Sequence, residues 1–188
     1  MELYEGRPAS NEGREEKEIR VYDLLDRLGI HYQRTDHEPA DTMEACGRID
    51  AILGVLICKN LFLTNRNKSR FYLLMMPGDK EFRTKELAHQ HGLQRLSFAS
   101  PEDMKRLIDL TPGSVSVTGL MNDPEGRVQL LVDEDVLKGE YVGCHPSMNT
   151  SSLKMKTKDL FDVFLPAVGH DPWIVKLEGK REETPAEE

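Results

Sequence analysis

The chain has 188 residues, a formal net charge of −8 and an isoelectric point near 5.3. This acidity argues against a protein that coats nucleic acid, because such proteins gain most of their affinity from Lys and Arg residues that neutralise phosphates. The length fits one domain, and the longest apolar run, residues 51–58, is far too short to span a bilayer.

Five of the eight excess negative charges lie within residues 1–18 and 176–188. We expect residues 1–14 to be flexible, residues 15–177 to fold, and residues 178–188 to form a disordered acidic tail. The sequence starts without a basic and apolar leader, so we expect a cytoplasmic protein. Its three cysteines, Cys46, Cys58 and Cys144, form no CxxC pair, which fits neither a disulfide framework nor a usual zinc site.

The first half of the chain predicts alternating helices and strands. Apolar residues recur at helical spacing over residues 15–28, ahead of Gly29, a residue type common at helix C-termini. A short strand is expected at residues 31–35, and Asp41 or Thr42 begins a helix that reaches about residue 53. Residues 61–64 and 71–76 are rich in strand formers and flank a polar turn, which indicates a hairpin.

The second half continues the alternation. We expect short helices at 84–91 and 100–109, strands at 114–118, 128–132, 141–144 and 152–155, a helical turn at 133–137, and a helix at 157–164 capped by Thr157. Regular βαβ spacing is missing. The sequence therefore predicts a single α+β domain with a mixed, largely antiparallel sheet and packed helices.

Three segments carry side chains suited to chemistry. Lys59 and Asn60 open an apolar strand, where the lysine either snorkels from an edge or anchors an anion or hydroxyl. Residues 110–119 form a hydroxyl-rich, glycine-bounded loop, which is either a plain turn or a set of amides for an oxyanion. Residues 142–152 place His145 among Ser, Asn and Thr, either as a hydrogen-bonded turn or as a site for a ribose or carbonyl.

Two further candidates are weaker. Cys144 and His145 are neighbours on an extended chain and point to opposite faces, which disfavours a nucleophilic pair. Asp123 lies in an Asn-Asp-Pro turn, with its carboxylate either structural or facing the cleft.

Together and in this order, these segments resemble the YbaK-like aminoacyl-tRNA deacylases, and within them the free-standing prolyl-tRNA editing branch, which is similar to the editing domain inserted in bacterial prolyl-tRNA synthetases. The resemblance covers about residues 21–175. The matching motifs are Cys58-Lys59-Asn60-Leu61-Phe62-Leu63, Arg95-Leu96-Ser97-Phe98, Pro112-Gly113-Ser114-Val115-Ser116 with Gly119-Leu120-Met121-Asn122-Asp123, and Gly143-Cys144-His145-Pro146 with Asn149-Thr150.

The resemblance implies a hydrolase, without metal or organic cofactor, that cleaves the ester of mischarged tRNA(Pro), with alanine as the first candidate. It implies that Lys59 holds the terminal adenosine of the acceptor end, that the amides of the Gly113 loop handle the ester, and that His145 sets the pocket size. The implied supporting residues are Asn60, Ser114, Val115, Asp123, Gly143, Asn149 and Thr150. The implied partners are the tRNA acceptor end and prolyl-tRNA synthetase.

One difference from the family pattern leaves more than one substrate possible. The family loop is typically Gly-x-x-x-Pro, and here Val117 replaces the proline, so the pocket could instead accept Cys-, Ser- or Thr-tRNA. Two different kinds of protein also fit the motifs. One is a catalytically silent module that binds tRNA or a synthetase, and the second is a hydrolase that uses the Cys144 thiol.

For the hydrolase we expect positioned water and a stabilised oxyanion rather than a covalent intermediate, because an aminoacyl ester is already activated. Because the net charge of the chain is −8, we expect it to contact only the acceptor end of the tRNA rather than a long stretch of backbone. The candidate contacts are Lys59, Arg66, Lys68, Arg70, Lys80, Arg83, Lys85, Lys154, Lys156 and Lys158.

Overall fold

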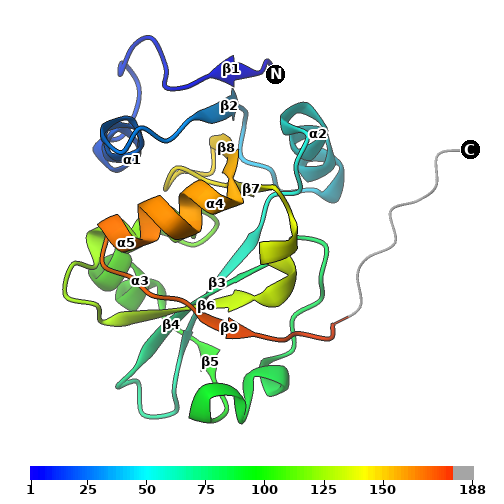
Figure 1. Ribbon diagram of the computed structural model, residues 1–188, viewed down its shortest axis with the longest axis vertical. Helices are drawn as coiled ribbons and strands as arrows, with labels where there is room; N and C mark the ends of the chain where they lie inside the picture. The colour runs from blue at the N-terminus through cyan, green and yellow to red at the C-terminus, as the bar shows by residue number, and fades with distance from the viewer. Residues whose placement is uncertain (180–188) are drawn as a thin grey trace, which may run out of the picture.

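The computed structural model describes residues 1–179 (Figure 1). Its strands are β1 (Tyr4–Glu5), β2 (Tyr32–Asp36), β3 (Lys59–Thr64), β4 (Phe71–Met76), β5 (Ser97–Phe98), β6 (Val128–Asp133), β7 (Tyr141–Cys144), β8 (Ser151–Lys156) and β9 (Trp173–Val175). Its α-helices are α1 (Glu16–Arg27), α2 (Met43–Leu53), α3 (Pro101–Ile108), α4 (Thr157–Asp159) and α5 (Leu165–Ala167), with a π-helical turn, η5 (Leu160–Phe164), joining the last two. Short 3-10 helices are η1 (Thr84–Leu87), η2 (Gln90–Gly92), η3 (Val117–Asn122) and η4 (Glu134–Lys138).

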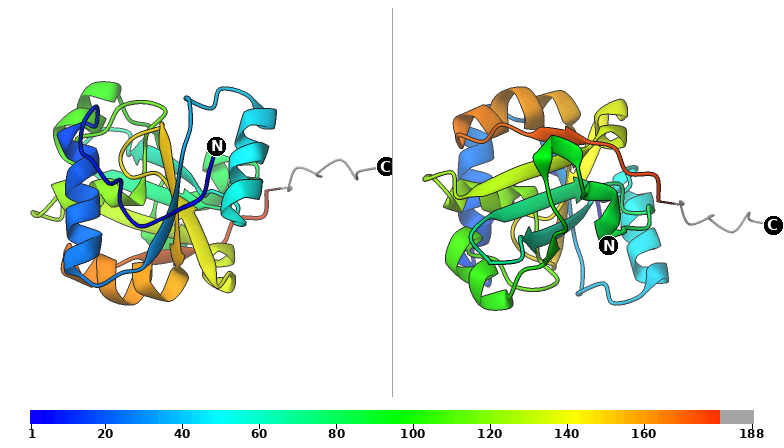
Figure 2. Two further views of the ribbon diagram at one scale, coloured as in Figure 1. Left: turned by 90° about the horizontal axis from the view of Figure 1, so that it is seen from above. Right: turned by 90° about the horizontal axis from the view of Figure 1, so that it is seen from below.

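The strands form two sheets. One is antiparallel in the order β1-β2-β8-β7, and the other has the order β5-β3-β4-β6-β9. In the second sheet β3 is antiparallel to β4 and β5, whereas β4, β6 and β9 are mutually parallel. Figure 2 shows α1 and α2 on opposite flanks of the molecule. The predicted α+β domain with mixed, largely antiparallel strands is confirmed, with the strands divided between two sheets.

Strand β4 shows how this fold encloses its core. Phe71, Leu73 and Met75 pack into the core between the two sheets, and the alternating Tyr72 and Leu74 pack into a second cluster on the outer face. Burial on both faces explains why this strand reads as a continuous apolar run. A one-residue slip would exchange the two sets, so the register that positions neighbouring β3 is firmly specified.

The predicted flexible N-terminal segment instead packs onto the domain. β1 pairs with β2, and Arg7 Nη1 lies 2.7 Å from Asp23 Oδ1 on α1. Arg14 binds carboxylates of α1 and β2, as described below. These ion pairs and strand hydrogen bonds hold residues 1–14 in place, although their polar composition alone predicts a flexible segment.

Other differences concern short or non-local elements. β5 and β9 are not predicted, because two- and three-residue strands carry little pattern of their own. In place of the strand predicted at residues 114–118, residues 114–116 are irregular and residues 117–118 begin η3. Lys156 rather than Thr157 precedes α4. Residues 180–188 of the predicted tail lie outside the described residues. Within residues 1–179 no helix is long and apolar enough to cross a membrane.

Candidate active site

The start of β3 lies against β7 and joins the two sheets. Ile57 forms an isolated parallel bridge with Gly143, and the Cys58 amide donates to the Gly143 carbonyl oxygen at 2.9 Å. A Cβ at position 143 would lie 3.0 Å from the Ile57 Cα, so this close approach favours glycine. Lys59 and Asn60 therefore begin their strand beside the chain that leads into the loop after β7.

Buried hydroxyl groups join the loop after β7 to the loop ahead of η3. Ser116 Oγ donates to the His145 carbonyl oxygen at 2.6 Å, and Thr118 Oγ1 donates to the same oxygen at 3.0 Å. Thr118 Oγ1 also lies 3.0 Å from Ser147 Oγ. Because all three hydroxyl residues are buried, they hold the two loops together rather than face a ligand.

The Gly113 loop presents two amides. Gly113 has φ +88°, a left-handed conformation that favours glycine, and a Cβ there would lie 3.6 Å from Asn149 Nδ2. The Ser114 amide donates to the Thr111 carbonyl oxygen at 3.1 Å, so it is already used. Within residues 1–179 the amides of Gly113 and Val115 make no backbone hydrogen bond, so both remain available as donors.

Lys59 and Asn60 leave β3 on opposite faces, as neighbours on a strand do. Lys59 Nζ donates to the Lys80 carbonyl oxygen at 2.9 Å and lines a cavity of about 590 Å³. On the other face, Asn60 Nδ2 donates to the Cys58 carbonyl oxygen at 3.2 Å. Asn60 Oδ1 is buried without a hydrogen-bond partner among the described residues, which is uncommon for a buried polar atom.

The cavity beside Lys59, here called the Lys59 cavity, is basic. Its other lining residues are Leu61, Phe82, Arg83, Thr84, Lys85, Arg95 and Phe98. Four of the lining residues are Lys or Arg, and none of them is Asp or Glu. In a chain of net charge −8 this is a local positive site suited to a phosphate.

A hydrogen-bonded chain orients His145. Its Nδ1 lies 3.0 Å from the Ser151 carbonyl oxygen and 3.2 Å from Ser152 Oγ. His37 Nε2 lies 2.8 Å from Ser152 Oγ, and His37 Nδ1 lies 2.8 Å from the Glu38 carbonyl oxygen. Since carbonyl oxygens only accept, each of the two histidines carries a proton on Nδ1. Burial lowers the pKa of His145, which favours its neutral ring. His145 Nε2 therefore keeps its lone pair.

Next to these hydrogen bonds of His145 lies a network of ion pairs that involves residues near the N-terminus. Ser151 Oγ donates to Asp36 Oδ1 at 2.7 Å, and Arg14 donates to Glu18 Oε1 at 2.6 Å and to Asp36 Oδ2 at 2.8 Å. Burial by itself would raise the pKa of Asp36, but hydrogen bonds from Arg14, Arg34 and Ser151 hold that pKa well below its usual range. The Asp36 carboxylate is thus charged. It holds Ser151 on β8, whose carbonyl oxygen binds His145 Nδ1.

The environment of His145 also predicts a pH effect on stability. Burial, together with the nearby His37 ring, lowers the pKa of His145 below its usual 6.5. The folded state holds the neutral ring, so its stability is complete above about pH 6.5 and falls as the pH drops toward the folded-state pKa, because the unfolded chain then binds more protons. The loss is about 1.4 kcal/mol for each unit of pKa difference.

We therefore expect His145→Gln to lose less free energy of unfolding than the wild type between about pH 7 and pH 5. Glutamine keeps a donor for the Ser151 carbonyl oxygen but does not titrate. Urea denaturation at each pH measures the difference. Parallel curves for the two proteins would show that His145 titrates normally.

The similarity to known proteins covers this site. A family model described as the aminoacyl-tRNA editing domain matches residues 37–163, from His37 into η5. The chain belongs to the aminoacyl-tRNA editing domain family. As a member of this family it is an aminoacyl-tRNA deacylase, and the resemblance noted in the sequence is confirmed.

Individual relatives agree with the family. The prolyl-tRNA editing protein ProX of Acetoanaerobium sticklandii is 32% identical over 136 residues, which are 72% of this chain and 83% of that protein. The prolyl-tRNA synthetase associated domain-containing protein 1 of Xenopus laevis is 30% identical over 158 residues, 82% of this chain and 93% of that protein. A solved structure described as a proposed trans-editing enzyme for prolyl-tRNA synthetase has a TM-score of 0.61 at 18% identity and covers 87% of this chain and 98% of that one; it supports the fold.

Not every residue predicted for the editing site faces it. Asp123 is fully buried, and its carboxylate accepts from the amides of Arg127 at 3.0 Å and Val128 at 2.8 Å, with His170 Nε2 at 3.5 Å. It is therefore a buried cap for a turn rather than a cleft-facing carboxylate. Ser114 is likewise buried, with its hydroxyl donating to Thr111.

Two other predicted residues act through their backbone. Gly143 provides the close contact with Ile57, and the Thr150 carbonyl oxygen accepts from the His37 amide at 3.0 Å. The predicted site residues do not include His37. Ser116, Thr118, Ser147 and Ser152 lie in the two predicted hydroxyl-rich segments, but no individual role is predicted for them. His37 and Ser152 are 115 residues apart, so no local pattern announces their contact.

The position of the family's loop proline, occupied here by Val117, remains compatible with proline. Val117 is fully buried in the core between the sheets and is the first residue of η3. Ser116 before it is extended, with φ −150° and ψ 151°, and within residues 1–179 the Val117 amide makes no hydrogen bond. Proline fits such a position, since it favours the start of a helix after an extended residue.

We therefore expect Val117→Pro to change the free energy of unfolding by less than about 1 kcal/mol. Thr118→Pro is the matched control. It removes an amide that donates to Ser116 Oγ at 3.3 Å and a hydroxyl that binds the His145 carbonyl oxygen, so it should cost about 3 kcal/mol or more. Chemical denaturation compares the two, and equal destabilisation would contradict this view of the loop.

Proposed function

We propose that this deacylase acts in trans on tRNA(Pro) mischarged with alanine and hydrolyses the ester that links the amino acid to the terminal ribose. The observation that carries the proposal is the convergence of three segments. The start of β3 bears Lys59 and Asn60 and bonds to β7, and the loop after β7 bonds in turn to the Gly113 loop. An anchor for a nucleotide and amides for an oxyanion thus belong to one connected framework.

In the proposed reaction the Lys59 ammonium holds the terminal nucleotide, and the Gly113 and Val115 amides donate to the carbonyl oxygen of the ester. Water attacks the carbonyl carbon, and the amides stabilise the negative charge that develops on oxygen. The bond from carbon to the ribose oxygen then breaks, and the released ribose oxygen takes a proton. The neighbouring ribose hydroxyl orients the water.

Discrimination would come from excluding proline. A pocket rejects a group that is too large by steric clash, whereas it gains little from one more methylene. His145 is suited to be a wall of that pocket, because its ring is fixed through Ser152 and its loop through Ser116 and Thr118. A rigid wall turns a small difference in substrate size into a large difference in rate.

A thiol mechanism is disfavoured. Cys144 is fully buried, and burial raises the pKa of its thiol to about 12, so no thiolate forms near neutral pH. The Cys58 thiol has its pKa raised to about 12 for the same reason. We propose a cytoplasmic enzyme that works beside prolyl-tRNA synthetase, in keeping with the names of its relatives and with three unpaired cysteines.

The substrate assignment is tested by a panel of tRNAs charged with alanine, cysteine, serine or threonine, each incubated with the purified chain. We expect Ala-tRNA(Pro) to be hydrolysed fastest. A faster reaction with one of the others would reassign the substrate. Binding of tRNA without hydrolysis of any ester would instead identify a silent binding module.

A further inference from the structure

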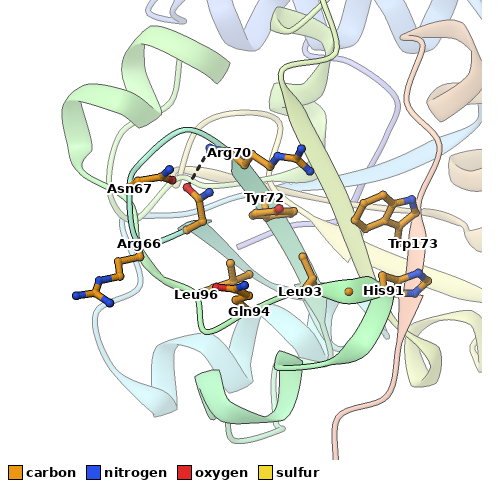
Figure 3. A pocket seen from close by; sticks show the side chains of 11 residues that line it. Arg66, Asn67, Arg70, Tyr72, His91, Leu93, Gln94, Leu96 and Trp173 are labelled. Carbon is orange, nitrogen blue, oxygen red and sulfur yellow. Dashed lines mark hydrogen bonds between the residues drawn. The ribbon is translucent and has the colours of Figure 1, made fainter.

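A second cavity, of about 610 Å³, lies past the other end of the β3–β4 hairpin from Lys59, beside the turn that joins the two strands. Figure 3 shows Tyr72 near its centre, Arg66 and Asn67 on one side, and Trp173 and His91 on the other. The remaining lining residues are Asn65, Arg70, Gly92, Leu93, Gln94 and Leu96. We call it the Arg70 cavity. Nothing in the proposed reaction uses it.

The Arg70 cavity is positive in an otherwise acidic protein. Arg66 and Arg70 are both exposed, and the lining residues include no Asp or Glu. Figure 3 shows Arg70 extending past Tyr72 toward Trp173, whereas Arg66 points outward. Guanidinium groups without carboxylates beside them favour a ligand with anionic oxygens, phosphate above all.

Aromatic groups form the opposite wall and are held in place. The rings of His91 and Trp173 stack with centroids 5.3 Å apart and planes 13° apart. His91 Nε2 lies 2.6 Å from the Ile174 carbonyl oxygen, which pins the imidazole to β9. A cationic groove with aromatic side chains is the usual surface for a nucleic-acid strand.

The two basic cavities share a wall. Leu93, Gln94 and Leu96 line the Arg70 cavity, and the intervening or following Arg95 and Phe98 line the Lys59 cavity. Lys59 begins β3 and the turn with Arg66 follows its end, so Lys59 and this turn lie roughly 20 Å apart at about 3.3 Å per strand residue. Neither cavity has an acidic lining residue, and the two basic cavities adjoin along residues 93–98, although Arg83 of the Lys59 cavity is paired with Glu81 at 3.1 Å.

We propose that the Arg70 cavity binds backbone phosphates of the tRNA beyond its terminal nucleotide, while Lys59 holds that nucleotide. The inference rests on the proposed function, because it places a second contact on the same substrate. RNA is favoured over an acidic protein segment, since the Arg70 cavity adjoins the Lys59 cavity, where we place the terminal nucleotide of the acceptor end. Lys80 is excluded from this face, because its ammonium is buried against Asp133 and Asp135.

The test is the double variant Arg66→Ala/Arg70→Ala, assayed with full-length Ala-tRNA(Pro) and with alanyl-adenosine, which is too short to reach the cavity. We expect kcat/KM for the full-length tRNA to fall roughly tenfold and its logarithmic salt dependence to weaken by about 1 to 2. The rate with alanyl-adenosine should be unchanged. Equal losses on both substrates, or no loss on either, would overturn the inference.

Binding of uncharged tRNA(Pro), measured without any hydrolysis, separates this inference from the proposed reaction. We expect the double variant to bind more weakly than the wild type, and equal affinity would overturn the inference whether or not the chain hydrolyses Ala-tRNA(Pro). Arg66→Lys/Arg70→Lys keeps both charges and should retain most of the salt dependence. Arg27→Ala, an exposed residue at the end of α1, removes a charge elsewhere and should leave affinity within about twofold.

Discussion

Replacing Lys59 with alanine is expected to lower kcat/KM for deacylation of Ala-tRNA(Pro) by roughly 10- to 150-fold, the value of a lost hydrogen bond to a charged group. The ammonium lies at the start of β3, where it lines a basic cavity without acidic neighbours among its lining residues. In the proposed reaction, its removal takes away the anchor for the terminal nucleotide and misplaces the ester relative to the Gly113 loop. Single-turnover hydrolysis measures the effect.

Lys85→Ala is the matched control for Lys59→Ala. Lys85 lines the same cavity and is exposed, but it stands on η1 rather than at the junction with β7. We expect its removal to change the rate by about threefold or less, as for other exposed charges. A Lys59→Ala enzyme within a few fold of the wild type would remove Lys59 from the site, provided that thermal unfolding shows both variants folded.

Replacing Lys80 with alanine is expected to cost about 3 to 5 kcal/mol of unfolding free energy. Its Nζ lies 2.6 Å from Asp133 Oδ2, 2.8 Å from Asp135 Oδ2 and 2.8 Å from the Leu177 carbonyl oxygen. Asp133 is fully buried, so the substitution leaves a carboxylate in the interior without its cation. It also releases the contact between the end of β6 and residue 177. Chemical denaturation measures the loss.

Lys138 provides a comparison within the same cluster. Its Nζ lies 2.6 Å from Asp135 Oδ1, but its side chain is 70% exposed, against 4% for Lys80. Water screens the exposed pair, so Lys138→Ala should cost less than about 1 kcal/mol. Similar losses for the two variants would mean that burial does not govern this cluster.

The parts of the fold that follow from local pattern are predictable from the sequence. The apolar spacing of α1 and the polar turn between β3 and β4 are visible in single stretches of chain. The parallel order of β4, β6 and β9 is not, because it joins segments far apart in sequence and leaves no periodic signal. The N-terminal residues pair with β2 despite their polar composition for the same reason.

In the site, too, some residues can be recognised from a local sequence pattern, whereas others depend on partners far away in the sequence. Gly113 and Lys59 are recognisable because glycine at a turn and a lysine at the head of an apolar strand are unusual locally. Lys80 looks like one of several bases between residues 59 and 85, yet Asp133, 53 residues later, draws it into the interior. Asp123 looks available in its turn, but the amides that follow it take up its carboxylate. Long-range partners, which sequence spacing does not reveal, decide both cases.

The central claim is tested most directly by the hydrolysis of Ala-tRNA(Pro) and Pro-tRNA(Pro) by the wild-type chain, each compared with its spontaneous rate. The oxyanion amides and the fixed His145 wall predict rapid release of alanine, with proline released at least roughly tenfold more slowly. Equal rates for the two esters, or no hydrolysis of Ala-tRNA(Pro) above the spontaneous rate, would contradict the account.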